Sequence, residues 1–169
     1  YTAYRVVNSE SDGLPGLIVD RYNGFLVCQF LSAGAEYLKN KILAVLDDIF
    51  QPEGIYERSD SSSRNKEGLN RTTGLLSGKE PPEYIEIREG DVRFMVDVFN
   101  GHKTGFYLDQ RENRELVGRY SCGEEVLNCF SYTGGFCVHA LKGGAARVTN
   151  IESSEDHLFL TGKNVALNG

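Results

Sequence analysis

The sequence predicts an α/β protein in which an α+β domain precedes the first strands and helices of a doubly wound parallel sheet. Short β-rich runs separated by turn signals fill the first part of the chain, as strands of a small sheet do. Residues 124–168 then alternate strand, helix, strand and helix, which is the pattern of a right-handed parallel crossover. We expect a boundary near residue 99, with domains at 1–99 and 100–169.

Three strands are predicted at the start of the first domain, in YRVVNS, GLIVDRY and FLVCQFL. The pair Asn23-Gly24 lies between two of these apolar runs and is a strong signal for a two-residue hairpin. Residues 35–50 then show helical periodicity. The predicted apolar face of this helix consists of Leu38, Ile42, Val45, Leu46 and Ile49.

The middle of the chain is predicted to hold a strand, a long loop and a hairpin. GIYERSD has the pattern of the strand, and residues 60–80 are polar and glycine-rich, which favours a loop. YIEIRE and VRFMVDV alternate at period two around Gly90-Asp91 and predict an antiparallel hairpin. An RNA contact and a solvated loop remain alternatives for four basic residues, which acidic residues interleave: Arg58, Arg64, Lys66 and Arg71.

Residues 101–120 are predicted to form a loop that leads into a helix. Asp109 is the expected N-cap, with Glu112 three residues later in a capping-box pattern. The apolar side of this helix is predicted to hold Leu116, Val117 and Tyr120. The crossover follows as strand EEVLNCF, helix GGFCVHALKGG, strand ARVTNIE and helix SSEDHLFLTGKNVALN.

Composition narrows the class of protein. The net charge of −6 argues against a surface that coats nucleic acid, although a local basic patch can still meet RNA. No apolar run approaches the roughly 20 residues of a membrane span, so we expect no membrane partner. The four cysteines lack metal-ligand spacing, which favours reduced thiols, no metal and a cytoplasmic location, with Cys28, Cys129 and Cys137 buried. Because the chain starts without methionine, we expect a piece of a longer protein.

The turn after the first strand of the crossover is the predicted ligand site, because ligands of open parallel sheets lie beyond the carboxyl ends of the strands. This places residues 128–135 and Glu152 at one edge. A pyrophosphate needs the close backbone approach that G-x-G-x-x-G provides. Here the turn has only the pair Gly134-Gly135, preceded by two aromatic residues. A dinucleotide is therefore disfavoured.

S-adenosylmethionine suits this turn better because it has no phosphates. Its carboxylate can accept hydrogen bonds from N–H groups at a helix N-terminus, and a strand-end carboxylate can accept from the ribose hydroxyls. Glu152 lies 18 residues after Gly134, near the spacing of about 20 expected for a ribose acid. The alternative is a turn that only begins a helix, with Glu152 as a cap for the next helix.

Longer motifs carry a family resemblance. HKTGFYLDQRENR followed by VLNCFSYTGGF resembles the class I methyltransferases that modify large-subunit ribosomal RNA, in particular the cytosine-5 group. NSESDGLPGLIVDRY, at residues 8–22, resembles the central domain of that family. The resemblance implies a Rossmann-like methyltransferase domain from residue 100, S-adenosylmethionine as cofactor and ribosomal RNA as partner, and it allows a homodimer. It also implies a PUA domain before this region and further chain after it.

The resemblance assigns cofactor-binding residues as well. The segment that closes over the cofactor is matched by Thr104, Phe106, Gln110 and Arg111. The first strand and its turn are matched by Asn128, Phe130, Tyr132, Thr133 and Gly134. The acid that binds the ribose is matched by Glu152, and the residue after it by Ser153. Phe106 is expected to pack against the cofactor and Arg111 to pair with its carboxylate. The alternative for Gln110 and Arg111 is a polar first turn with an Arg–Glu pair across the helix.

In the reaction that the resemblance implies, a cysteine thiolate adds to C6 of cytosine so that C5 can take the methyl group. An Asp-Pro-Pro base-binding motif and a later nucleophilic cysteine are implied too. The one Pro-Pro pair, Pro81-Pro82, follows Glu80. We therefore expect no catalytic residue here, with the nucleophile beyond residue 169, and His139 and His157 as surface or packing residues. A non-catalytic cofactor- or RNA-binding module is the alternative, and a dinucleotide oxidoreductase a weaker one.

Overall fold

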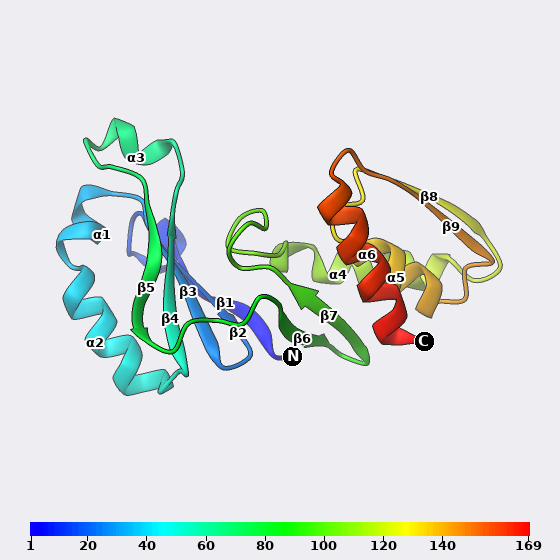
Figure 1. The fold of residues 1–169 in the computed structure, drawn as a ribbon, viewed down its shortest axis with the longest axis horizontal. Helices are drawn as coiled ribbons and strands as arrows, with labels where there is room; N and C mark the ends of the chain where they lie inside the picture. The colour runs from blue at the N-terminus through cyan, green and yellow to red at the C-terminus, as the bar shows by residue number, and fades with distance from the viewer. The chain divides into compact units, whose positions relative to one another are not determined.

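The computed structural model describes residues 1–169, which divide into two compact units (Figure 1). The N-terminal unit comprises residues 2–85 and 96–106, and the C-terminal unit comprises Tyr1, 86–95 and 107–169. This division differs from the predicted boundary near residue 99, because residues 86–95 of the hairpin group with the C-terminal unit. None of the helices is both long enough and apolar enough to cross a membrane.

A five-stranded sheet in the order β1-β2-β3-β4-β5 forms the N-terminal unit. Its elements, with a short 3-10 helix, are β1 (Ala3–Asn8), η1 (Ser9–Asp12), β2 (Leu17–Tyr22), β3 (Phe25–Phe30), β4 (Gly54–Ser59) and β5 (Thr72–Gly78). Only β3 and β4 run parallel. The predicted hairpin at Asn23-Gly24 is confirmed, since Tyr22 pairs with Phe25 and Asn23 adopts φ +54°.

Two helices, α1 (Ala33–Tyr37) and α2 (Lys39–Phe50), make the parallel step from β3 to β4 and cover one face of the sheet (Figure 1). The predicted single helix is thus broken, at Leu38. The predicted apolar face was also partly wrong, because Val45 and Ile49 are 54% and 64% exposed. Apolar residues surround much of α2, so periodicity alone did not select the packed side. The side chains of α2 that pack on the core are Ile42, Leu43, Leu46 and Phe50.

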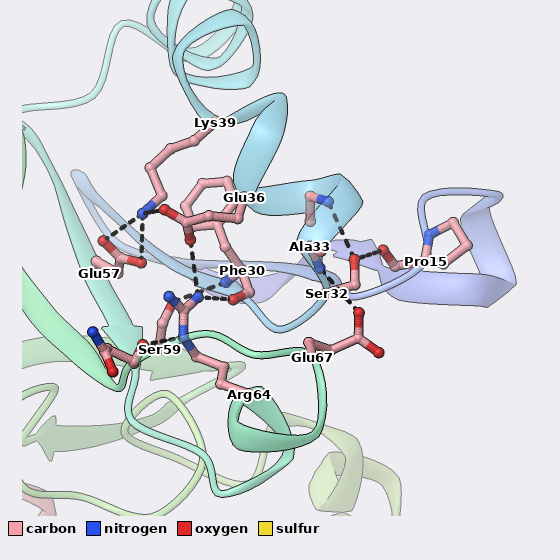
Figure 2. Close-up of polar contacts among 12 residues, drawn as sticks. Pro15, Phe30, Ser32, Ala33, Glu36, Lys39, Glu57, Ser59, Arg64 and Glu67 are labelled. Atoms are coloured by element: carbon pink, nitrogen blue, oxygen red, sulfur yellow. Dashed lines mark hydrogen bonds and ion pairs between the residues drawn. The ribbon is translucent and has the colours of Figure 1, made fainter.

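Residues 60–80, predicted as a loop, contain a helical turn, α3 (Ser63–Lys66), and the edge strand β5. The prediction was wrong because long-range contacts order this segment despite its glycine-rich composition. Strand β5 pairs antiparallel with β4. The buried guanidinium of Arg64 donates to the carbonyls of Phe30 and Asn70 and pairs with Glu36 at 2.9 Å. Figure 2 shows this anchor and the further ion pairs from Glu36 to Lys39 and on to Glu57.

Two of the four basic residues considered for RNA contact are buried and hydrogen-bonded to other parts of the fold. Arg58 donates to the carbonyls of Val98 at 2.6 Å and Gly101 at 3.0 Å. Arg64 is held by carbonyls in the same way. A buried guanidinium that donates its hydrogen bonds to backbone carbonyls is not available to bind phosphate. The hypothesis that Arg58 and Arg64 contact RNA was therefore wrong. Lys66 and Arg71 are exposed.

The C-terminal unit combines an antiparallel hairpin with the predicted crossover. Its elements are β6 (Ile85–Glu89), β7 (Val92–Val96), η2 (Leu108–Gln110), α4 (Arg111–Tyr120), β8 (Glu125–Cys129), α5 (Gly135–Lys142), β9 (Arg147–Ile151) and α6 (Glu155–Asn168). Strands β8 and β9 are parallel, in register from Glu125 opposite Arg147 to Cys129 opposite Ile151. The hairpin, the crossover and the α/β fold class are thereby confirmed.

One face of the β8–β9 pair is outward. Leu127, Cys129 and Ile151 alternate onto this face and are exposed, whereas Asn128 and Asn150 are half-buried on the other. The prediction that Cys129 is buried was therefore wrong, because the period of two carries it outward with Leu127. Cys28 and Cys137 are buried as expected, and all four cysteines are free.

Helix α4 buries polar residues rather than its apolar ones. Leu116 and Tyr120 are 46% and 77% exposed, and the buried residues are Arg114 and Gly118. The predicted apolar side was wrong, because the helix packs through an ion pair and a glycine. A Cβ on Gly118 would lie 2.9 Å from the carbonyl oxygen of His139. The predicted cap was wrong too, since Gln110 holds the N-cap position without a side-chain hydrogen bond.

A buried carboxylate, Glu89, joins the hairpin to two helices. Arg114 Nε donates to Glu89 Oε2 at 2.9 Å, its Nη2 pairs with Oε1, and its Nη1 donates to the carbonyl of Tyr107 at 2.8 Å. His139 Nε2 lies 3.5 Å from Glu89 Oε2, and its ring stacks on Phe94, which confirms a packing role. Burial raises the pKa of Glu89, but the His139 and Arg114 side chains beside its carboxylate outweigh this effect, so the net pKa is lowered.

Two asparagines of α6 hydrogen-bond to the backbone of β7. Asn168 accepts from the N–H of Arg93 at 2.9 Å and donates to the Arg93 carbonyl at 2.8 Å. Asn164 accepts from the N–H of Met95 at 2.7 Å. Side-chain amides thus satisfy strand groups that would otherwise stay unpaired. These bonds explain why residues 86–95 belong to the C-terminal unit.

We predict that Glu89→Gln in the full-length protein lowers the free energy of unfolding by about 3–5 kcal/mol at pH 7, because Arg114 is left buried without its counter-charge. The pKa of Glu89 is lower in the folded state than in the unfolded state, where it is about 4.3. Ionised Glu89 therefore stabilises the fold above about pH 4.3, and this stability is lost as the pH falls through the folded pKa. The variant should therefore lose less stability than wild type between pH 6 and pH 3 in urea titrations.

Glu86→Gln is the matched control in the same strand. Glu86 lies 3.6 Å from Arg93, and both side chains are about two-fifths exposed, so this change should cost less than about 1 kcal/mol. Equal losses in the two variants would contradict the role given to Glu89.

Candidate cofactor-binding site

The turn between β8 and α5 has a strained backbone. Phe130 and Tyr132 adopt φ +57° and +49°, in the left-handed region that side chains disfavour, and Gly134 follows at +79°. Each such non-glycine residue costs about 1–3 kcal/mol and persists only where surrounding contacts fix it. Such strain clusters at ligand sites, so the turn is a candidate site with an identifiable set of supports.

Glu152, at the end of β9, supports the turn from one side. Its Oε2 accepts from the N–H of Tyr132 at 2.8 Å, and its Oε1 accepts from the N–H groups of Ser153 at 2.8 Å and Ser154 at 3.1 Å. The capping alternative for Glu152 was wrong, because Ser154 is the N-cap of α6 and its hydroxyl accepts from the N–H of His157. Because a carboxylate oxygen has two lone pairs, Oε2 keeps capacity for one further donor.

Glu152 is an acceptor at neutral pH. Burial raises the pKa of its carboxyl, but hydrogen bonds from the backbone N–H groups of Ser154, Tyr132 and Ser153 outweigh this effect and lower the pKa. The hydroxyl of Ser153 also lies 3.2 Å from Oε1. Glu152 and Ser153, both predicted at the end of the second strand, are therefore joined directly: the backbone and the hydroxyl of Ser153 donate to the Glu152 carboxylate.

Helix α6 supports the turn from the other side. The Thr161 hydroxyl lies 3.0 Å from the carbonyl oxygen of Tyr132, and Asn164 Nδ2 donates to the carbonyl of Thr133 at 2.9 Å. A Cβ on Gly134 would lie 2.6 Å from Thr161 Cγ2. Gly134 is therefore needed both for its positive φ and for the close approach of α6.

The N-terminus of α5 offers hydrogen-bond donors beside this turn. Gly134 is the N-cap and no side chain caps the helix, so the first-turn N–H groups have no intrahelical acceptor and carry the positive end of the helix dipole. The buried hydroxyls of Ser131 and Thr133 have no hydrogen-bond partner. Beside them the Phe130 ring is 91% exposed. These groups suit a ligand with a carboxylate and an apolar or aromatic part.

The remaining predicted residues of the C-terminal unit are engaged with protein groups. Asn128 Nδ2 donates to Asn150 Oδ1 at 2.8 Å. Gln110 Oε1 accepts from Asn113 at 2.9 Å. Arg111 lies 3.7 Å from Glu89 Oε1, and its guanidinium stands 4.2 Å from the ring centroid of Tyr1. An Arg–Glu pair thus exists, but it joins α4 to β6 instead of crossing the helix.

Thr104 and Phe106 belong to the N-terminal unit, where they are anchored on β2. The Thr104 hydroxyl donates to Asp20 Oδ2 at 2.5 Å and lies 2.8 Å from Tyr22 Oη. The N–H of Phe106 donates to the same Tyr22 oxygen at 3.2 Å, and both residues are buried. Their assignment to the cofactor stays a prediction, as does that of Gln110 and Arg111.

Sequence reasoning missed Thr161 and Asn164. The available signal was weak: two polar residues three positions apart in a helix. They lie on the buried side of α6, where the third buried residue is Leu160. Their role is visible only once α6 is packed against the turn.

Comparison with known proteins identifies the family. The family model of S-adenosylmethionine-dependent methyltransferases matches residues 65–169. The chain belongs to this family. The expected cofactor class and Rossmann-like fold are thereby confirmed. A solved methyltransferase from Streptococcus mutans has the same fold over 99% of this chain and 43% of its own, with a TM-score of 0.86 and 30% identity.

Two curated relatives match almost the whole of this chain. The proteins named ribosomal RNA large subunit methyltransferase I from Aeromonas salmonicida and Vibrio parahaemolyticus are 52% and 54% identical over 99% of this chain. The chain spans 42% of the length of each. A second solved methyltransferase, with 29% identity and a TM-score of 0.86, is complexed with S-adenosylhomocysteine.

We predict that Gly134→Ala distorts the turn. The new Cβ meets Thr161 at a positive φ, so we expect a loss of about 2–4 kcal/mol in unfolding free energy, and affinity for S-adenosylhomocysteine should fall at least about tenfold. Urea unfolding and calorimetric titration of the full-length protein measure the two effects.

Gly162→Ala is the control on α6. Its Cβ would have no atom within 4 Å, so this variant should be unchanged or up to about 1 kcal/mol more stable. An unchanged affinity in Gly134→Ala would place the cofactor away from this turn.

Proposed function

We propose that this chain is the cofactor-binding part of an enzyme that methylates large-subunit ribosomal RNA, with C5 of cytosine as the methyl acceptor. The strained turn at Phe130–Gly134, held by Glu152 and α6, carries the cofactor part of the proposal. The names and identities of the curated relatives support ribosomal RNA as the substrate. The cytosine-5 position rests on the sequence resemblance alone.

The groups at the turn fit S-adenosylmethionine. The free N–H groups at the start of α5 would bind its carboxylate, Glu152 Oε2 would accept from a ribose hydroxyl, and the exposed Phe130 ring would contact an apolar part of the cofactor. We include Gln110, Arg111 and Asn128 in the proposed site. When bound, the cofactor supplies an electrophilic methyl group on a sulfonium.

We assign no catalytic residue to this chain. Burial raises the pKa of the Cys28 and Cys137 thiols, which makes them poor nucleophiles at neutral pH. Cys129 is exposed at the end of β8 and is the cysteine nearest the turn in sequence. We propose that it belongs to the wall of the site, with the attacking thiolate outside residues 1–169. A cytoplasmic location and a homodimer complete the proposal.

We predict that Glu152→Ala weakens binding of S-adenosylhomocysteine by about 1–3 kcal/mol, the scale of lost charge-assisted hydrogen bonds. Calorimetric titration of the full-length protein tests this, with NAD titrated in parallel. Glu155→Ala removes an exposed carboxylate from the first turn of α6 and should leave affinity unchanged. Equal affinities for all three proteins would remove Glu152 from the site, and binding of NAD alone would reject the cofactor assignment.

We predict methyl transfer to large-subunit ribosomal RNA. The full-length protein, incubated with labelled S-adenosylmethionine and unmodified ribosomal RNA, should give 5-methylcytidine when the RNA is digested to nucleosides and analysed by mass spectrometry. Cys129→Ser should retain transfer, because its thiol is not the proposed nucleophile. Label in another nucleoside would overturn the cytosine-5 assignment, and cofactor binding without transfer to any RNA would favour a binding module.

A further inference from the structure

We infer that Asn164 positions the cofactor-binding turn by coupling it to the β6–β7 hairpin. This inference deepens the proposed function and rests on it for the identity of the ligand. Asn164 is fully buried, and its side-chain amide makes one bond in each direction: Oδ1 accepts from the N–H of Met95 at 2.7 Å, and Nδ2 donates to the carbonyl of Thr133 at 2.9 Å.

The two partners fix the orientation of this amide. The N–H of Met95 requires an acceptor and the carbonyl of Thr133 requires a donor, so a flipped amide would lose both bonds. Aspartate would keep the acceptor for Met95 but would place an oxygen against the Thr133 carbonyl. A hydrophobic residue would leave two backbone groups of separate elements unsatisfied. Only an amide of this length matches both partners.

Holding the carbonyls of the turn also directs its N–H groups. The C=O and N–H of a trans peptide point in opposite directions across a rigid plane. The carbonyls of Tyr132 and Thr133 are directed toward Thr161 and Asn164, so the N–H groups that follow them point away from α6. These N–H groups are those of Thr133 and Gly134, and the Gly134 N–H donates to the Ser131 carbonyl at 2.9 Å. The bonds from α6 therefore fix the two peptides that lead into α5, in a backbone that is already strained at Tyr132.

Asn168 provides an internal comparison. It lies one helical turn later and binds both backbone groups of Arg93 in the same hairpin. Its other side-chain bond is to the carbonyl of Asn164 in its own helix, at 2.7 Å. Asn168 thus shares the attachment to the hairpin but makes no bond to the turn. A loss specific to Asn164 would therefore report on the turn.

The test compares Asn164→Asp and Asn168→Ala in the full-length protein. Asn164→Asp should weaken S-adenosylhomocysteine binding at least about tenfold, the effect of one lost buried hydrogen bond with an unfavourable oxygen contact. The amides of residues 133–136 should also exchange hydrogen faster in this variant without cofactor. Asn168→Ala should keep affinity and turn exchange within about twofold of wild type, although the amides of β7 exchange faster.

Two readouts separate the possible failures. If Asn164→Asp and Asn168→Ala change affinity and turn exchange equally, Asn164 only attaches the hairpin and the inference is wrong. If wild type does not bind S-adenosylhomocysteine, the proposed function fails. Turn exchange, which is measured without cofactor, then still decides whether Asn164 holds the turn. Faster exchange confined to Asn164→Asp supports the coupling in either case.

Discussion

The carboxylate of Glu89 is the contact on which the C-terminal unit depends. It lies in β6, out of contact with water, and it is bonded by Arg114 of α4 and approached by His139 of α5. Removing a charge from water costs several kcal/mol, and only an oppositely charged partner with matched geometry offsets this cost. The bidentate guanidinium supplies this match and adds a bond to the Tyr107 carbonyl. One buried charge therefore joins the hairpin, α4 and α5, and with them the end of the cofactor turn.

The turn itself illustrates how strain is distributed. Its positive φ angles at Phe130 and Tyr132 oppose folding, and inside the turn the Gly134 N–H donates to the Ser131 carbonyl at 2.9 Å. The opposing contacts come from both sides: Glu152 binds the Tyr132 N–H, and α6 binds the carbonyls of Tyr132 and Thr133. A backbone held from both faces has few conformations open to it. A ligand would then meet donors that are already oriented, which lowers the entropic cost of binding.

Local patterns in the sequence predicted the elements well. Asn23-Gly24 marked its hairpin, and the strand–helix–strand run from 124 to 152 was read correctly, because turn chemistry and periodicity act within a few residues. The errors arose where distant residues decide. Arg114 was not among the residues predicted for the packed side of α4, yet Glu89, 25 residues away, makes it a buried residue. Arg64 likewise orders a segment whose composition resembles a loop. In the site, Glu152 and the turn were predicted, but Thr161 and Asn164 lack any motif of their own.

In the N-terminal unit, side chains of the motif at residues 8–22 hold the segment of residues 96–106. Its Asp20 is fully buried and accepts from Arg5 at 2.8 Å as well as from Thr104. Its Tyr22 receives the N–H of Phe106. A second attachment comes from Arg58, whose guanidinium binds the carbonyls of Val98 and Gly101. Residues 96–106 are thus fixed along the sheet by side chains, without being a strand of it. Gly105 allows this path, because its φ is +139° and a Cβ there would lie 2.9 Å from Val96 Cγ1. The two stretches that carry the family resemblance in this unit are therefore one structural feature: the first motif supplies the groups that hold the second.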